Sequence, residues 1–136
     1  MIHELVVNLH MHTTYSDGSG LHADLGLAAL KTGVDVVLAT DHNTLVQGMD
    51  GYYRERRKRA LVLVCEEIHD QDRDPQKNHL LVFNVDQDFS PLADDPQNLI
   101  SAVQRSGGLS FIAHPIECAM PAFGETDISW VDWKIS

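Results

Sequence analysis

Cysteine is scarce in this chain of 136 residues, which contains only Cys65 and Cys118. Two widely separated cysteines do not form a disulfide framework, so we expect two reduced thiols. Long apolar runs are also absent, which predicts that no segment spans a membrane. The N-terminal residues lack the layout of a signal peptide. Together these absences predict a cytoplasmic protein without a membrane partner.

Positive charge is scarce as well, with 10 Lys and Arg against 20 Asp and Glu and a formal net charge of −10. Because such a chain repels a phosphate backbone, nucleic acid is predicted to be an unlikely partner. The one basic run, residues 54–59, is interpreted as the solvated end of a helix, with an anion-binding patch for a substrate phosphate as the alternative. A Gly-rich phosphate loop is missing, which disfavours an ATP-dependent mechanism.

Short apolar stretches alternate with helical or loop segments along the chain. This alternation predicts a single domain of the α/β class with a largely parallel sheet. Besides the helix that ends in the basic run, helices are expected over residues 21–32 and 98–105, with Gly33 as the C-terminal cap of the first of these. Five strands are expected, over residues 4–9, 34–40, 60–65, 80–85 and 109–113.

Two histidines at the end of the first expected strand are the centre of the functional argument. His10 and His12 are two residues apart, and residues i and i+2 of a strand point to the same face. The two imidazoles can therefore chelate a metal such as Zn²⁺, Mn²⁺ or Fe²⁺. The alternative is a pair of ordinary polar residues at a strand end.

Other histidines and carboxylates also follow expected strands. Asp41 and His42 follow the second, Glu66 and Glu67 the third, and His114 the fifth. Because the carboxyl ends of strands in α/β folds converge on one face, these side chains are expected to gather there. His79 is the exception, since it begins its strand.

In sequence order, these motifs resemble the PHP (polymerase and histidinol phosphatase) domain, and most closely its CehA/McbA-like metallohydrolase branch. The resemblance implies a distorted (β/α)7 TIM-like barrel, here incomplete with about five strands. It also implies a cluster of two or three divalent metal ions (Zn, Mn or Fe) at the strand ends. The matching motifs are His10-x-His12, Ser16-Asp17-Gly18, Thr40-Asp41-His42-Asn43, Glu66-Glu67-Ile68, Asn78-His79-Leu80 and Ala113-His114-Pro115.

Carried over residue by residue, the resemblance implies seven metal ligands in three partial sites. Glu67 is chosen over Glu66 because the family pattern is Gly-x-Glu, with Cys65 in the glycine position; Glu66 is the alternative. The implied sites are His10, His12 and Glu67 for the first metal, Glu67, His79 and His114 for the second, and Asp17 with His42 for a third.

Four further polar residues are given other roles. Asp41 is expected to orient an imidazole without binding metal itself. His3, His22 and His69 match no ligand position, so surface or structural roles are expected for them, with His69 the nearest to the site.

The family's late Asp-x-His motif has no counterpart after His114, and a family barrel needs about seven strands. We therefore interpret residues 1–136 as a single PHP domain that is truncated at its C-terminal end. The alternative is a reduced version completed by a second copy. Unpaired strand edges would then favour either homo-oligomerisation or low stability.

The chemistry implied is that of a metal-dependent hydrolase, with phosphoesterase activity favoured. Two divalent metals about 3.5–4 Å apart can share a hydroxide that acts as the nucleophile, so no side chain is assigned a catalytic role. The expected partner is a small-molecule ester or phosphoester substrate. A carboxyl or carbamate ester or amide hydrolase is the first alternative. A non-catalytic metal-binding module or inactive fragment is the second.

Overall fold

The computed structural model describes residues 2–134, which gather into two compact units that meet in sequence between Glu66 and Glu67. We refer to them as unit 1 and unit 2 and describe each by itself. Neither of the two α-helices in the described range is long and apolar enough to cross a membrane. The elements are β1 (Val7–Met11), α1 (His22–Thr32), β2 (Val36–His42), β3 (Gly51–Glu55), β4 (Lys58–Ile68), β5 (Leu80–Phe83), the 3₁₀ turn η1 (Ser90–Leu92), α2 (Pro96–Arg105), β6 (Leu109–Ile112) and the 3₁₀ turn η2 (Pro121–Phe123).

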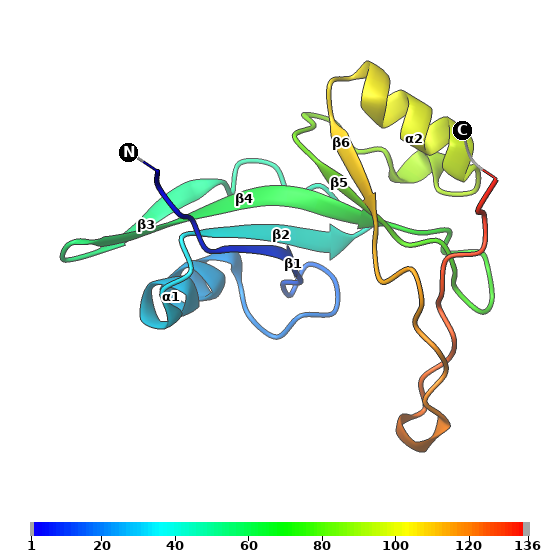
Figure 1. The fold of residues 1–136 in the computed structure, drawn as a ribbon, viewed down its shortest axis with the longest axis horizontal. Helices are drawn as coiled ribbons and strands as arrows, with labels where there is room; N and C mark the ends of the chain where they lie inside the picture. Colours follow the sequence, from blue (N-terminus) through cyan, green and yellow to red (C-terminus); the bar gives the residue numbers. More distant parts are fainter. Residues whose placement is uncertain (1, 135–136) are drawn as a thin grey trace. The chain divides into compact units, whose positions relative to one another are not determined.

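Unit 1 is a mixed sheet covered on one face by α1 (Figure 1). β1 pairs in parallel with β2, β2 neighbours β4, and β3 pairs antiparallel with β4. Burying the apolar stripe of α1 against β2 and β3 excludes water from these surfaces and stabilises the unit. The buried core of this unit is Leu25, Ala29, Leu30, Val37, Ala39, Ala60 and Val62.

The first helix ends where the sequence predicts. Gly33 adopts the left-handed conformation with φ 82°, and its N–H donates to the Ala29 carbonyl oxygen at 2.9 Å. A residue without a Cβ takes this conformation at little cost, so Gly33 caps the helix. At the other end, Asp24 in the first turn accepts a hydrogen bond from the Leu21 N–H at 2.8 Å. The expectation of a helix over residues 21–32 is confirmed.

The basic run is not the end of a helix, and that prediction is wrong. Residues 54–59 form the tip of the β3–β4 hairpin, with Glu55 opposite Lys58 and a two-residue turn between them. Side chains therefore alternate between the two faces of the ribbon. Tyr53 packs against the core on the α1 side, whereas Tyr52 is exposed on the other face. This alternation of buried and exposed side chains, with a period of two residues, is typical of a β-strand.

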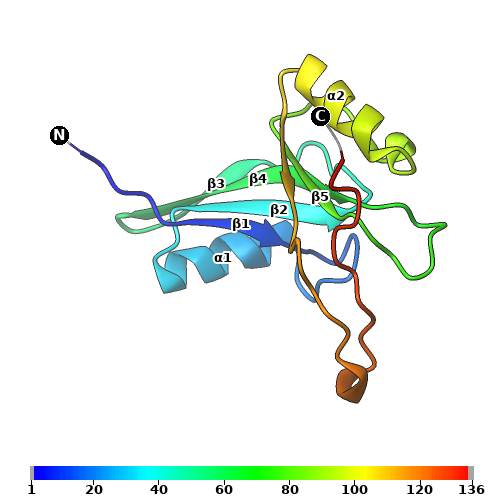
Figure 2. The ribbon, with the colours of Figure 1, turned by 45° about the vertical axis from the view of Figure 1, so that its right-hand side comes forward.

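Unit 2 contains an antiparallel pair, β5 with β6, and the helix α2, which contacts β6 (Figure 2). The Asp95 side chain accepts a hydrogen bond from the Asn98 N–H at 3.0 Å, and Pro96 occupies the first turn. Both are favoured where a helix begins. The buried core of this unit is Ile68, Leu80, Val82, Phe89, Leu99, Val103 and Trp130.

The expected (β/α)7 TIM-like barrel, including its incomplete form, is wrong. Such a barrel consists of parallel strands, each followed by a helix. Here β3 and β4 are antiparallel, as are β5 and β6. Two α-helices and six strands lie in the described residues, so most strands have no helix of their own. All five expected strands occur with shifted ends, and β3 is the sixth.

The C-terminal segment of unit 2 has little regular structure and is held by side chains that precede β5. Lys77 Nζ donates to Asp127 Oδ1 at 2.8 Å and to the Asp127 carbonyl oxygen. This bond, together with the bonds from Ser129, lowers the pKa of Asp127 to about 2. Asn78 donates to Asp132 and accepts from the Val131 N–H at 2.8 Å. The segment is therefore tied at three points to two consecutive residues.

We expect Leu80→Ala in β5 to lower the free energy of unfolding by about 2–5 kcal/mol, because Leu80 is 1% exposed and its removal leaves a cavity. The matched control is Leu109→Ala in the partner strand β6, where the side chain is 58% exposed. The control should change the free energy by less than about 0.5 kcal/mol. Chemical denaturation monitored by tryptophan fluorescence measures both. Equal losses for the two variants would contradict the assignment of the core.

Candidate metal sites

Two strand ends position the histidines of unit 1. The register of β1 against β2 shifts between Asn8 and Met11, and such an irregularity re-aims the side chains beside it. Thr40 of β2 secures this part of β1, since its Oγ1 accepts from the Met11 N–H at 3.2 Å. His10 is the second-last residue of β1, and His12 directly follows the strand. His42 is the last residue of β2. The parallel pairing of the strands thus places three imidazoles at one sheet end.

These three histidines and Asp17 form what we call the N-terminal cluster. The Nε2 atoms of His10 and His12 are 2.9 Å apart. Asp17 lies between the other two rings, with Oδ1 at 3.2 Å from His12 Nδ1 and Oδ2 at 3.6 Å from His42 Nε2. The His12 and His42 side chains are about one-fifth exposed and that of Asp17 is 67% exposed, so the cluster is reachable from solvent. All four ligands predicted within unit 1 are therefore brought together.

Asp41 supports the cluster without contacting its imidazoles. Its side chain is 1% exposed, and it accepts hydrogen bonds from the Thr13 N–H and hydroxyl, both at 2.7 Å, and from the Ser16 hydroxyl at 2.8 Å. The sequence-based expectation that Asp41 orients an imidazole is replaced by this role in holding the loop. Gly18 closes the same loop so tightly that a Cβ there would lie 2.2 Å from the His12 carbonyl oxygen. Glycine is required at this close approach.

Unit 2 contains a second group, the C-terminal cluster, made of Glu67, His79 and His114. Glu67 Oε1 lies 3.0 Å from His79 Nδ1 and 2.9 Å from His114 Nε2. Glu67 and His79 are 1% and 3% exposed at their side chains, whereas His114 is 24% exposed. The three ligands predicted within this unit are thus also brought together. The contacts of Glu67 favour it over Glu66 as the ligand, although both carboxylates are buried.

Glu117 is a member of this group that the sequence argument missed. Its Oε2 lies 3.0 Å from His114 Nδ1, three residues earlier in the chain. The hydrogen bond with Glu67 is the main cause that raises the pKa of His114, burial opposes it, and the charge of Glu117 adds to the rise. A carboxylate beside Nδ1 favours the proton on that nitrogen and leaves Nε2 of the same ring available as a ligand. The only sign of this contact in the sequence is that Glu117 follows His114 by three residues.

The three histidines outside the predicted ligand set differ from one another. His3 is exposed. His69 stacks on His79 with ring centroids 4.4 Å apart, in agreement with the expectation that it lies nearest to a site. His22 is fully buried at the start of α1, with its ring edge against Tyr15 at 5.7 Å between centroids. Neither ring nitrogen of His22 has a hydrogen-bond partner among the described residues.

The donor atoms of both clusters fit a divalent metal. With Zn–N bonds of about 2.0–2.1 Å, two ligand nitrogens lie about 2.9–3.4 Å apart for angles of about 90–110° at the metal. The separation of 2.9 Å between the Nε2 atoms of His10 and His12 falls at the lower end of this range. In unit 2, one carboxylate oxygen faces two imidazole nitrogens at similar distances. Mixed imidazole and carboxylate donors suit Zn²⁺, Mn²⁺ or Fe²⁺.

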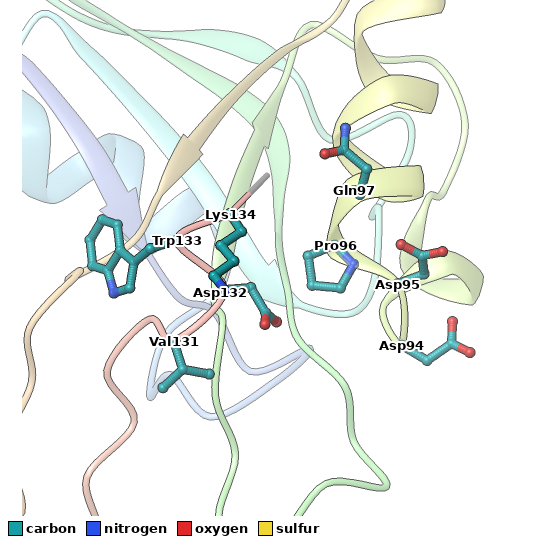
Figure 3. Close-up of a pocket in the computed structure, with 8 residues that line it drawn as sticks. All are labelled: Asp94, Asp95, Pro96, Gln97, Val131, Asp132, Trp133 and Lys134. Carbon is teal, nitrogen blue, oxygen red and sulfur yellow. The ribbon is translucent and has the colours of Figure 1, made fainter. Parts of the chain in front are cut away.

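A cleft of about 880 Å³ in unit 2 is a separate feature (Figure 3). Asp94 and Asp95 reach it from the turn before α2, and Asp132, Trp133 and Lys134 from the end of the described chain. None of the seven predicted ligands lines it. The cleft therefore contributes nothing to the metal-site argument.

Comparison with known proteins gives one distant relative. The chain is 26% identical over 129 residues to "Uncharacterized protein MJ1587" of Methanocaldococcus jannaschii, an alignment that covers 87% of this chain and 72% of that protein. No model of a known protein family matches the chain. The relative's name states no function.

His22 gives a prediction for the pH dependence of stability. Burial lowers the pKa of His22 below its ordinary value of 6.5, while the charges of Asp41 and Asp50 oppose the change. The unfolded chain therefore binds the proton more readily, so the stability contributed by neutral His22 is lost as the pH falls below about 6.5. Because the raised pKa of His114 acts in the opposite sense in both proteins, we expect the urea midpoint of the parent to fall relative to that of His22→Gln between pH 7.5 and pH 5.5.

The control for this prediction is His3→Gln, because His3 is exposed. This variant should keep the pH dependence of the parent. A His22→Gln variant with the same pH dependence as the parent would show that other groups cause it. Both variants are compared with the parent at each pH, so a constant loss of stability in His22→Gln does not obscure the result.

Proposed function

We propose that this chain is a metal-dependent hydrolase that cleaves phosphoesters. The observation that carries the proposal is the gathering of all seven predicted ligands into two groups with distances suited to metal binding. Chance placement of separate histidines and carboxylates would rarely produce two such groups. The resemblance to the PHP domain supports the hydrolase class, although the barrel that it implies is not carried over.

Each side chain has a stated task in this proposal. His10, His12, Asp17 and His42 hold one metal ion, and Glu67, His79 and His114 hold another. Bound divalent ions lower the pKa of water and polarise a phosphoryl oxygen, which is the chemistry that a phosphoesterase needs. Asp41 holds the loop that presents Asp17. Glu117 lies beside Nδ1 of His114, favours the proton on that atom and so leaves Nε2 available as a ligand.

The proposal leaves the substrate class to experiment. A small phosphoester is favoured because the motif set resembles a family of phosphoesterases and related hydrolases. Carboxyl ester or amide hydrolysis would use the same ligands. A cytoplasmic location and homo-oligomerisation also stay predictions.

The first test is metal content per chain, measured by elemental analysis after incubation with Mn²⁺ or Zn²⁺ and removal of excess ion. We expect at least two ions per chain in the parent. His12→Ala and His114→Ala should each lose about one ion, since each removes a ligand from a different cluster. The exposed control His3→Ala should keep the parent value. A parent that retains no metal, or variants that all match it, would contradict the proposed sites.

The second test is hydrolysis of bis(p-nitrophenyl) phosphate and p-nitrophenyl acetate by the metal-loaded parent. We expect the phosphodiester to be cleaved and His12→Ala to be at least about 100-fold slower, because an essential metal is lost. His3→Ala should be unchanged. Cleavage of the acetate alone would replace the proposal with an ester hydrolase. Retained metal without any cleavage of either compound would identify a non-catalytic metal-binding module.

A further inference from the structure

Basic residues are concentrated at the tip of the β3–β4 hairpin, although the protein as a whole is acidic. Residues 54–59 contain five of the 10 basic residues of the chain and one glutamate, so this run carries five positive charges and one negative, a formal +4, against a net charge of −10 for the whole. All six side chains are exposed. Figure 1 shows the hairpin as a two-stranded ribbon that extends past the start of β2. A hollow of about 400 Å³, lined by residues 55–58, lies beside the turn.

The arrangement of these charges is unfavourable for the isolated protein. Arg54 and Arg59 are directly opposite each other on neighbouring strands, and like charges in this position destabilise a sheet. Within residues 2–134, none of the four arginines of the tip forms an ion pair with a carboxylate. The exposed Tyr52 ring lies beside two of them, with the guanidinium carbons of Arg54 and Arg59 at 5.3 and 5.8 Å from its centroid.

The residue in the turn is also unfavourable for the stability of the hairpin. Arg56 occupies the first position of a two-residue turn with φ 53°, in the left-handed region where glycine or asparagine is preferred. Glycine would satisfy this turn better than arginine. Two features of the tip lower its stability: the pairing of Arg54 with Arg59 and the arginine at position 56. Both add positive charge to the tip. Such features are expected where a surface serves a function other than folding.

The tip lies far from the N-terminal cluster within the same unit. β4 passes the start of β2 near its own beginning, since the Leu61 N–H donates to the Asp35 carbonyl oxygen at 2.8 Å. β2 rises about 3.3 Å per residue, so its six steps from Val36 to His42 span about 20 Å. The tip is therefore not the phosphate pocket of the N-terminal cluster, which was the alternative derived from the sequence. It needs a partner of its own.

We infer that the β3–β4 hairpin is a docking surface for the phosphate backbone of a single-stranded nucleic acid. Four of the five cations are arginines, whose planar guanidinium groups pair with phosphate oxygens through two parallel hydrogen bonds. Tyr52 supplies an exposed aromatic ring beside them, the combination by which proteins bind single strands without reading their sequence. Residues 54–59 contain no apolar side chain to enter a membrane.

The net charge of the chain does not oppose this inference. Exposed charges farther apart than about 8–10 Å are largely screened at physiological salt, so a phosphate at the tip experiences mainly the local charge. The prediction against nucleic acid used the net charge of the whole chain, whereas this inference uses the local charge of residues 54–59. The inference stands on the hairpin alone and does not rest on the proposed hydrolase function.

The test is binding of a fluorescein-labelled single-stranded RNA of about 20 nucleotides to the full chain, measured by fluorescence anisotropy at several salt concentrations. We expect the double variant Arg54→Gln/Arg59→Gln to bind at least about tenfold more weakly. Losing two phosphate contacts should also reduce the slope of log K against log salt by about 1.4. The matched control Lys31→Gln/Arg105→Gln removes two exposed charges elsewhere and should bind like the parent.

A second variant separates binding from folding. Arg56→Gly removes a charge but suits the left-handed turn, so we expect weaker RNA binding with an unfolding midpoint at or above that of the parent. Hydrolysis of bis(p-nitrophenyl) phosphate, if the parent shows it, should be unchanged in all these variants. The inference is overturned if the control weakens binding as much as the hairpin variant, or if the parent binds poly-glutamate or anionic phospholipid vesicles but not the RNA.

Discussion

A buried carboxylate at Asp41 is the constraint on which the geometry of unit 1 depends. A carboxylate that is 1% exposed requires hydrogen-bond donors in place of water, and Thr13 and Ser16 provide three of them. If the loop moved away, the carboxylate would remain buried without compensation, which is costly. The loop is thus held against β2, and Asp17 is left beside two imidazoles. The polar interior of this unit positions the ligands, while its apolar core only supports the strands.

The sequence was informative where local chemistry decides the outcome. Alternation at the end of β1 put His10 and His12 on one face, and the strand end of β2 supplied His42, so the gathering of these three histidines could be expected from local chemistry. Asp17 was expected beside them only through the motif resemblance. Gly33 likewise ended α1 for a local reason, its left-handed conformation. Glu67 and His79 could be expected as a pair only through the motif resemblance, because their proximity depends on the folding of unit 2.

The sequence was uninformative where distant pairing decides. A run of Tyr-Tyr-Arg with further basic residues suits either a helix or a strand, and only the pairing of Tyr52 with Leu61 selects the strand. The helix between β5 and β6 suggested a parallel crossover, yet these strands are antiparallel. The loop-holding role of Asp41 was also hidden, since it depends on hydrogen bonds to residues 25 and 28 positions away.

The hydrogen bonds of Lys77 and Asn78 connect the last described segment to residues about 50 positions earlier in the chain. Both residues directly precede His79, so the backbone that carries this imidazole is clamped from both flanks, by β5 on one side and by the C-terminal segment on the other. A protease cut ahead of Asp127 would release one flank and also withdraw Trp130 from the core of unit 2. Removal of the C-terminal segment would then reduce the order of the backbone at His79.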